Sequence, residues 1–382
     1  MTAAADSVRG LENVVVTATK LSAIDGGAGR LGYAGYPISD LAGQASFEEV
    51  CYLLWYGELP NAAQLRDFVA RLRAEAALTP AELELVRSAP TAGHGMDALR
   101  TLVSGLGQLD PQADDLSLEE AERIGLRLVA KMPTLIAAWH RLRNGQEPVA
   151  PRADGSHAAN LLWMLHGREP SPTAARAFDT YMVLLAEHGL NASTFAARVA
   201  IGAQADIYCA VVGAIGTLKG LLHGGANQKA METFLAIGAP DNAAPFIEEL
   251  LARRERLMGV GHRIYKVEDP RVRHLRAQVQ ALAGEADGPW QAVADAVGRV
   301  IAEHPHFTRR QLAPNVEFYS APLLYMLGLP LDLFTCAFAI SRIAGWMGHI
   351  REQIADNRLI RPKADYSGPA PRGFTPLADR PA

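Results

Sequence analysis

The sequence predicts an almost entirely α-helical protein with two unequal domains. Helix-start motifs recur along most of the chain, strand signals are confined to the N-terminal region, and the composition becomes more charged over residues 243–312. A chain of 382 residues is long enough for a large core and a second, smaller domain. Its 49% hydrophobic and 20% charged residues are typical of a folded globular protein.

The N-terminal region carries the strand signal. A β-branched run, Val14–Thr17, is followed a few residues later by the glycines of segment 26–29. β-branched residues favour extended backbone, and clustered glycines favour a tight turn. We therefore expect a small hairpin or β-ribbon here.

Helices are predicted from their first turns. Ser46–Glu49, Thr79–Glu82 and Ser117–Glu120 each place Glu three residues after Ser or Thr, which is the capping-box pattern. Proline at the first helical position supports the second of these, and Ser171-Pro172 opens another helix in the same way. Residues 151–155 are predicted to be the loop before a further helix.

The second half of the chain holds the packing helices. Small residues at helical spacing over 196–222 let helices approach closely, so this stretch is predicted to be the centre of an α-helical bundle. Pro245–Met258 is predicted to be a helix of the smaller domain, and Asp332–Asn357 one long helix. The tail from Arg358 is rich in Pro and Gly without periodicity, which predicts an extended arm.

Composition argues against several classes of protein. A net charge of −4 and a pI near 6.3 disfavour general nucleic-acid binding. Cys51, Cys209 and Cys336 all lie in apolar runs, so we expect buried, reduced thiols in a cytoplasmic protein. The first residues lack the basic and apolar regions of a secretory signal. Charges interrupt the most apolar segment, Leu331–Ile350, so no membrane span is predicted and the protein is expected to be soluble.

Four of the eleven histidines are candidates for a functional role. His188 lies where one helix is predicted to end, at Gly189, and another to start. His223 lies at a second predicted helix junction and His262 in a glycine turn, places where a ring nitrogen can face a cleft. His349 lies inside the long helix and is predicted to be a hydrogen-bonded core residue. Metal-binding motifs, a serine-hydrolase elbow and phosphate-binding glycine loops do not occur, so no metal or Rossmann nucleotide site is expected.

Glu317 is the acidic residue of interest. It lies between Val316 and two aromatic residues, so its carboxyl is expected to be partly buried, with a raised pKa. Such a carboxylate is suited to removing a proton from carbon. A salt-bridged structural glutamate fits the same pattern equally well.

Cationic residues come from three separate stretches. Arg263, Lys266 and Arg271 form a cationic edge suited to carboxylates or phosphates. Arg342 interrupts the apolar long helix, where an unpaired charge is costly, so it must meet either a structural carboxylate or a bound anionic substrate. Arg271 and Arg342, together with Arg361, could hold a di- or tricarboxylate if they converge.

Separated motifs along nearly the whole chain resemble those of the citrate synthase family, in its bacterial and archaeal dimeric type. The motifs are IDGGAGRLGYAGYPISDLA, EHGLNAST, LHGGAN, GVGHRIYKVEDPR, PNVEFYSA, and SRIAGW followed by RLIRPKADY. The resemblance implies an all-α, two-domain fold with a small N-terminal β-ribbon, and a homodimer whose active site lies between the domains. The large domain would comprise residues 1–222 and 322–382, including the arm, and the small domain residues 223–321.

The same resemblance implies roles for individual residues. His223 would stabilise the enol of acetyl-CoA, Glu317 would remove the methyl proton, and His262 would protonate the ketone of oxaloacetate. The residues implied to bind oxaloacetate are His188, Arg271, Arg342 and, supplied across the dimer, Arg361. The residues implied to hold CoA are Val260, Gly261, Lys266 and Asn315. Acetyl-CoA is then a co-substrate, and no permanently bound cofactor is implied.

Two positions depart from the family pattern, which has Asp in place of Glu317 and commonly Gly in place of Ala321. The extra methylene displaces the carboxylate by about 1 Å, and misplacement of that order can cost ~100-fold in rate. Ala321 and the tail sequence IRPKADYSGP also resemble 2-methylcitrate synthases, which use propionyl-CoA. We therefore expect a citrate synthase. A 2-methylcitrate synthase, and a weakly active or non-catalytic paralogue that binds CoA or dicarboxylates, are the alternatives.

Overall fold

In the computed structural model, which describes residues 8–380, a three-stranded antiparallel ribbon lies near the N-terminus. β1 (Ser22–Asp25) pairs with β2 (Arg30–Tyr33) across the glycine-rich turn, and β2 pairs with β3 (Tyr36–Pro37). The predicted ribbon is confirmed, but the assignment of Val14–Thr17 to it is wrong. That run lies outside the sheet, and Val15 is 88% exposed because no strand of residues 8–380 pairs with it.

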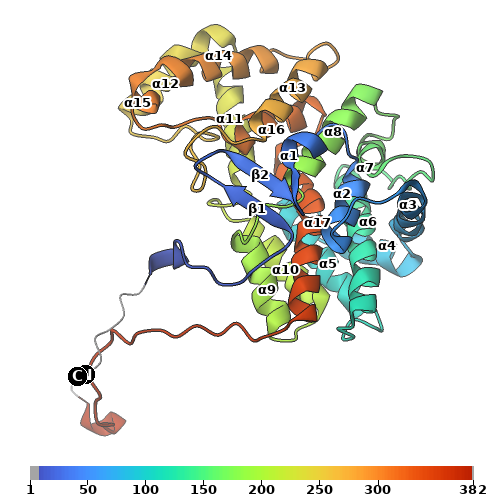
Figure 1. Ribbon diagram of the computed structural model, residues 1–382, viewed down its shortest axis with the longest axis vertical. Helices are drawn as coiled ribbons and strands as arrows, with labels where there is room; N and C mark the ends of the chain where they lie inside the picture. Colours follow the sequence, from blue (N-terminus) through green and yellow to red (C-terminus); the bar gives the residue numbers. More distant parts are fainter. Residues whose placement is uncertain (1–7, 381–382) are drawn as a thin grey trace.

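Helices form the rest of the architecture, which confirms the predicted all-α class (Figure 1). The helices of the first part are α1 Ile38–Leu41, α2 Phe47–Tyr56, α3 Ala62–Ala76, α4 Pro80–Ser88, α5 Gly95–Gln108, α6 Leu118–Arg143, α7 His157–His166, α8 Pro172–Leu185, α9 Ala192–Gly202 and α10 Ile207–Leu218. The remaining helices are α11 Ala226–Ile237, α12 Ala243–Ala252, α13 Val272–Leu282, α14 Trp290–Glu303, α15 Pro305–Thr308, α16 Val316–Met326 and α17 Phe334–Ala355. Short 3₁₀ turns occupy η1 Arg9–Leu11, η2 Pro240–Asn242, η3 Leu331–Leu333 and η4 Leu377–Asp379.

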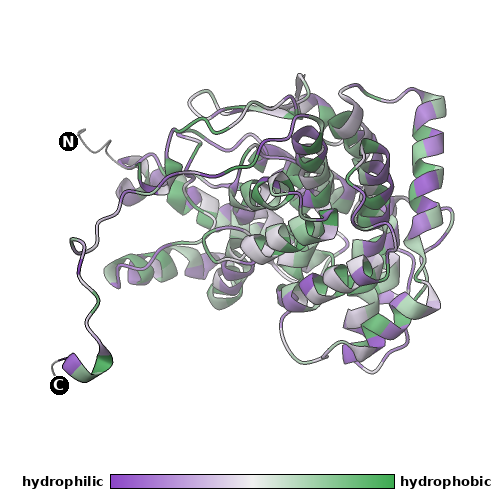
Figure 2. Ribbon diagram, turned by 90° about the horizontal axis from the view of Figure 1, so that it is seen from below, coloured by the Kyte–Doolittle hydropathy of each residue, from purple (hydrophilic) through white to green (hydrophobic). Residues whose placement is uncertain are grey.

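Helix starts follow the local sequence. The capping boxes predicted for α2 and α4 both form, with Ser46 and Thr79 as the capping residues. At α6, Ser117 Oγ accepts from the backbone N–H of Glu120, but the Glu120 carboxylate pairs with Arg123 instead of returning the bond. α7 and α8 also begin where predicted. Figure 2 shows hydrophilic and hydrophobic residues alternating along peripheral helices, as expected where one face meets solvent.

Two helix ends differ from the prediction. α8 ends at Leu185 rather than at Gly189, and α12 ends at Ala252 rather than continuing to Met258. Left-handed backbone follows each end, with φ of +61° at Gly189 and +59° at Arg254. The chain therefore leaves each helix earlier than predicted, and the first of these turns carries His188.

α17 is the central helix of the molecule (Figure 1). It packs against α2, α6, α8 and α9, and every residue from Phe334 to Ile350 is buried. By length and composition Leu331–Ala355 could cross a membrane, contrary to the sequence-based judgement, but its apolar window is 100% buried inside the protein. Its apolar character is therefore that of a core helix, which also carries Arg342 and His349.

The helices α11 to α16 lie together at one side of the molecule (Figure 1). Within this group α16 packs against α11, α13 and α14, and α13 also packs against α8. The grouping agrees with a smaller unit, while the boundaries at residues 222 and 321 stay a prediction. Residues 1–7 and 381–382 of the predicted large domain lie outside the described part of the chain.

The chain leaves the body of the protein after α17, as predicted. Residues from Arg358 onward run as an extended, exposed arm (Figures 1 and 2). Its large apolar side chains, at least 59% exposed, are Leu359, Tyr366, Phe374 and Leu377. These apolar side chains of the arm are therefore open to solvent in the described chain.

The three cysteines differ in their burial. Cys51 and Cys336 are buried thiols, as predicted. The prediction for Cys209 is wrong, because this residue lies on the outer side of the first turn of α10 and is exposed.

Candidate active site

Two loops are held together by backbone pairing at the edge of a large cavity. Gly259 and Gly261 have φ of +81° and +83°, a conformation that other residues rarely adopt. Between them Val260 forms a β-bridge with Pro314, closed by N–H to O bonds of 2.8 and 2.9 Å. The Asn315 side chain adds a bond from Nδ2 to the first loop at 2.7 Å. This pairing holds the loop that precedes His262 beside the loop that precedes Glu317.

His262 follows the first loop, and its tautomer is set by the backbone. Its Nδ1 accepts from the N–H groups of Ile264 at 3.0 Å and Tyr265 at 3.2 Å. An accepting ring nitrogen carries no proton, so the proton lies on Nε2. Burial and the charge of Arg271 lower the pKa of His262 to about 4. At neutral pH this ring is therefore neutral and offers an Nε2–H donor.

Glu317 follows the second loop, in the first turn of α16. Its backbone N–H donates to Asn315 Oδ1 at 3.0 Å, which caps the helix. Burial raises the pKa of the Glu317 carboxyl, opposed in part by the charges of Arg271 and Arg342. Within residues 8–380 no cation forms an ion pair with this carboxylate. The salt-bridged alternative is therefore not what the structure shows, and Glu317 is a basic carboxylate.

His223 lies in the turn between α10 and α11. Its Nε2 is 2.8 Å from Ser193 Oγ and 3.4 Å from Ser193 N. Trp346 Nε1 donates to the same hydroxyl oxygen at 3.2 Å, which fixes the serine. Burial and the charge of Arg342 lower the pKa of His223 to about 4. Because Ser193 engages Nε2, the neutral ring has its Nδ1 left for a ligand.

Arg271 and Arg342 are buried cations, 2% and 1% exposed. Arg271 donates from Nε and Nη2 to Asp269 at 2.9 and 2.6 Å. Arg342 donates from Nε to Leu185 O at 2.7 Å, and its guanidinium lies 4.9 Å from the centre of the Phe338 ring. Among the described residues no carboxylate pairs with Arg342, and each arginine keeps N–H groups free. Buried N–H groups of this kind are suited to binding carboxylates.

His188 lies on the turn after α8 and is 7% exposed. Its Nε2 is 3.0 Å from the hydroxyl of Tyr265, and its ring meets that of His262 edge-on at 5.7 Å between centres. Burial, followed by the charges of Arg271 and Arg342, places the pKa of His188 well below its ordinary value. The ring is therefore a neutral hydrogen-bonding group.

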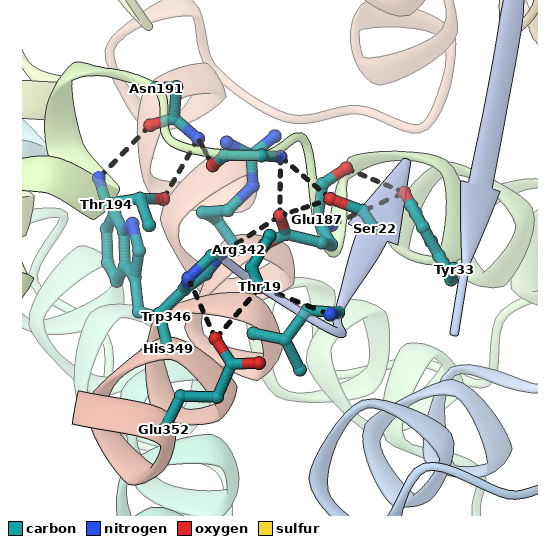
Figure 3. Close-up of polar contacts among 12 residues, drawn as sticks. Thr19, Ser22, Tyr33, Glu187, Asn191, Thr194, Arg342, Trp346, His349 and Glu352 are labelled. Atoms are coloured by element: carbon teal, nitrogen blue, oxygen red, sulfur yellow. Dashed lines mark hydrogen bonds and ion pairs between the residues drawn. The ribbon is translucent and has the colours of Figure 1, made fainter. Parts of the chain in front are cut away.

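One cavity of about 870 Å³ joins these groups, within the size range of small-molecule sites. Figure 3 shows Arg342 together with Trp346 and His349, which belong to the same helix, α17. The predicted residues that line it are His188, His223, His262, Lys266, Arg271, Glu317 and Arg342. In the described part of the chain no group of three or more ligating side chains could hold a metal ion.

Four predicted residues do not line the cavity. Val260, Gly261 and Asn315 belong to the paired loops that support it. Arg361 lies on the exposed arm, away from the other arginines. The structure of this single chain therefore does not bring Arg361 to the site.

Comparison with known proteins places this constellation in a family. The model described as "Citrate synthase, C-terminal domain" matches residues 10–363. The chain belongs to the citrate synthase family. Citrate synthase 2 of Bacillus subtilis is 44% identical over 98% of this chain and 99% of its own length. The 2-methylcitrate synthase of Mycobacterium tuberculosis (strain H37Rv) is 42% identical over 95% of this chain and 91% of its own length.

Solved citrate synthases share the fold. The crystal structure of the enzyme from Pyrobaculum aerophilum superposes with a TM-score of 0.90 at 41% identity, covering 97% of this chain and 95% of that one. The enzyme from Thermoplasma acidophilum, solved as a ternary complex with carboxymethyl coenzyme A and oxaloacetate, gives a TM-score of 0.90 at 28% identity. In that comparison 97% of this chain and 98% of the other are covered.

Several contributors to this citrate synthase family site were missed by the sequence analysis. Asp269 holds Arg271 from two residues earlier, and that short acid–arginine spacing is a readable signal. Ser193 lies within the EHGLNAST motif, but its contact with His223 depends on tertiary packing. Residues 10–14 and Val16 form one wall of the cavity, and their sequence gave no such indication.

Proposed function

We propose that this protein is a citrate synthase, which condenses acetyl-CoA with oxaloacetate and hydrolyses the resulting citryl-CoA to citrate and CoA. One observation carries the proposal: a single cavity collects an unpaired basic carboxylate, neutral histidines and two buried arginines with free N–H groups. Family membership and the named relatives support it.

The first step is removal of a proton from the methyl group of acetyl-CoA. This proton is weakly acidic, so the base needs a donor that stabilises the charge developing on the thioester oxygen. Glu317 is the base, because burial raises its pKa and no cation neutralises it. The backbone N–H of Ser193 donates to Nε2 of His223, which places the ring proton on Nδ1, the atom that donates to the thioester oxygen.

The second step forms the carbon–carbon bond. The enol carbon attacks the ketone carbon of oxaloacetate, and the ketone oxygen takes up a proton as its double bond opens. His262 Nε2–H supplies that proton, since its Nδ1 is occupied by the backbone. Water then cleaves the thioester of citryl-CoA and releases CoA.

Oxaloacetate carries two carboxylates, which match the buried guanidinium groups of Arg271 and Arg342, with His188 beside them. CoA is assigned to the loop of Val260 and Gly261, with Lys266 at the cavity edge. The proposal includes a homodimer in which the extended arm brings Arg361 to the site of the other subunit. A cytoplasmic location also stays a prediction.

A 2-methylcitrate synthase is the second candidate, favoured by the Mycobacterium tuberculosis relative. Ala321, one of the residues that suggested it, is 0% exposed in α16 and does not line the cavity. Any effect of Ala321 on the acyl group must therefore be indirect. We favour acetyl-CoA as the substrate.

The deciding experiment is steady-state CoA release with oxaloacetate and either acetyl-CoA or propionyl-CoA at matched concentrations. A higher kcat/KM for acetyl-CoA supports the proposal. For two acyl groups that differ by one methylene, the expected ratio of the kcat/KM values is ~10–200-fold. A preference for propionyl-CoA would make the protein a 2-methylcitrate synthase. No CoA release with either, from protein that still binds oxaloacetate, would indicate a non-catalytic paralogue.

A further inference from the structure

A buried polar network lies behind the cavity, where the turn after α8 meets α17 (Figure 3). Glu187, 0% exposed, is its centre. Its Oε1 accepts from His349 Nε2 at 3.0 Å, from Ser22 Oγ at 2.9 Å, and from the backbone N–H of Gly189. Donors from the ribbon, the turn and α17 thus converge on one oxygen. His188 lies between Glu187, which carries this oxygen, and Gly189, whose N–H donates to it.

A hydrogen bond to the other ring nitrogen of His349 determines which nitrogen carries the proton. Arg198 Nε, which can only donate, bonds to His349 Nδ1 at 3.0 Å. The Nδ1 atom is therefore unprotonated, and Nε2 carries the proton donated to Glu187. Arg198 is held in turn by Gln353 Oε1 at 3.1 Å and by the carboxylate of Glu352. Each member of the network is thereby ordered by the next.

The second oxygen of Glu187 is in a different situation. Oε2 is buried without a hydrogen-bond partner among the described residues. A Cβ at Gly345 would lie 2.3 Å from this oxygen and 2.4 Å from Ala186 O, so only glycine fits. The Gly345 N–H donates to Ala186 O at 3.1 Å. α17 therefore meets the turn at backbone contact distance, one helical turn from Arg342.

The geometry points to Glu187 as a positioning residue for oxaloacetate: its carboxylate, held by His349, sets the position of His188 relative to Arg342. This inference rests on the proposed function. Glu187 does not line the cavity and does not pair with Arg342, so it acts through its neighbours. The loops assigned to CoA are outside this network. Loosening the network should therefore weaken oxaloacetate binding and leave acyl-CoA binding unchanged.

The test replaces His349, which leaves the charge of Glu187 beside Arg342 in place. His349→Asn is too short to reach Glu187, whereas the side-chain amide of His349→Gln can still donate to it. The control is Glu82→Gln, which removes a buried carboxylate from its ion pairs with Arg127 and Lys131 and does not line the cavity. The measurements on the intact protein are calorimetric oxaloacetate binding, KM for both substrates, and Tm.

We expect His349→Asn to raise the oxaloacetate Kd and KM about tenfold, with the acyl-CoA KM within about twofold of wild type. His349→Gln should restore oxaloacetate binding, and Glu82→Gln should lower Tm without changing the ratio of the two KM values. Parallel changes in both KM values, or equal loss in the Asn and Gln variants, would overturn the inference. If the wild type binds no oxaloacetate, the proposed function falls and this inference with it. If the wild type binds and His349→Asn binds equally well, the inference alone is wrong.

Discussion

At the scale of single residues, burial controls the chemistry of the site. The pKa values of His188, His223 and His262 all lie below the ordinary value, because burial and nearby arginines disfavour a charged ring. The same burial raises the pKa of Glu317. One environment therefore gives neutral donors and a basic carboxylate together.

Substitution of Glu317 tests its role as the base. We expect Glu317→Gln to lower kcat by ~10²–10⁴-fold, the usual contribution of a general base, while oxaloacetate binding is retained. Glu317→Asp should also lose rate, by ~100-fold, because the paired loops fix the start of α16 and the shorter side chain recedes by about 1 Å. Single-turnover rates and oxaloacetate calorimetry measure both effects. Unchanged turnover in the Gln variant would remove Glu317 from the mechanism.

The pH dependence of kcat/KM follows from the same pKa shifts. The active form has Glu317 ionised and the histidines neutral. Since the pKa values of His223 and His262 are about 4, their rings stay neutral from pH 7 down to that value. The acid limb therefore belongs to Glu317, whose pKa lies above its ordinary 4.5, so activity falls as the pH drops through that pKa. A pH–rate profile measures the limb, and loss of that limb in Glu317→Gln, at its residual rate, would confirm the assignment.

Residue identities at the site could largely be predicted from sequence, but their partners could not. His223, Glu317 and Arg342 were singled out because glycine, aromatic or apolar neighbours are visible along the chain. Ser193 on His223, and Tyr265 on His188, depend on which helices pack together. The prediction that Cys209 is buried was wrong for a related reason, since an apolar run does not indicate which face of its helix is exposed to solvent.

At the scale of elements, the paired loops position the catalytic groups. Gly259→Ala would place a Cβ 3.0 Å from the Phe318 backbone, in addition to the strain of a positive φ. We expect kcat/KM to fall ~100-fold, because the base and the acid would move apart by about 1 Å.

The control for that substitution is Gly145→Ala. Gly145 has φ +71°, but a Cβ there meets nothing within 4 Å. Both variants carry the strain of a positive φ, so both should lower Tm, the Gly259 variant more because of its clash, while only the Gly259 variant should lose activity. Equal loss of activity in both would show that backbone strain, rather than loop pairing, matters.

Element starts were predictable and element ends were not. Capping motifs are local, so Ser46 and Thr79 could be recognised from four residues each. The ends of α8 and α12 depend on where the chain must turn to reach the cavity and the next helix. Val14–Thr17 has strand-forming residues, but a strand needs a partner, and the glycine turn supplies partners only to the residues on either side of it.

At the scale of the whole molecule, the proposed homodimer predicts that the exposed arm brings Arg361 to the site of the other subunit. Mixing tests this directly. Glu317→Gln and Arg361→Ala each disable both sites of their own homodimer, but a hybrid dimer holds one site with both wild-type residues. After unfolding and refolding of an equal mixture, we expect roughly a quarter of wild-type activity. Activity no higher than the sum of the separately refolded variants would show that Arg361 serves its own chain or none.

The network behind the cavity also ties the two ends of the chain together. Thr19 donates to Glu352 at 2.8 Å across 333 residues of sequence. During synthesis at ~5–20 residues per second, the N-terminal segment waits roughly 20–70 s for that partner to be made. The contact that anchors this segment to α17 can therefore form only after nearly all of the helix has been made, so the cavity wall beside it is completed late in synthesis.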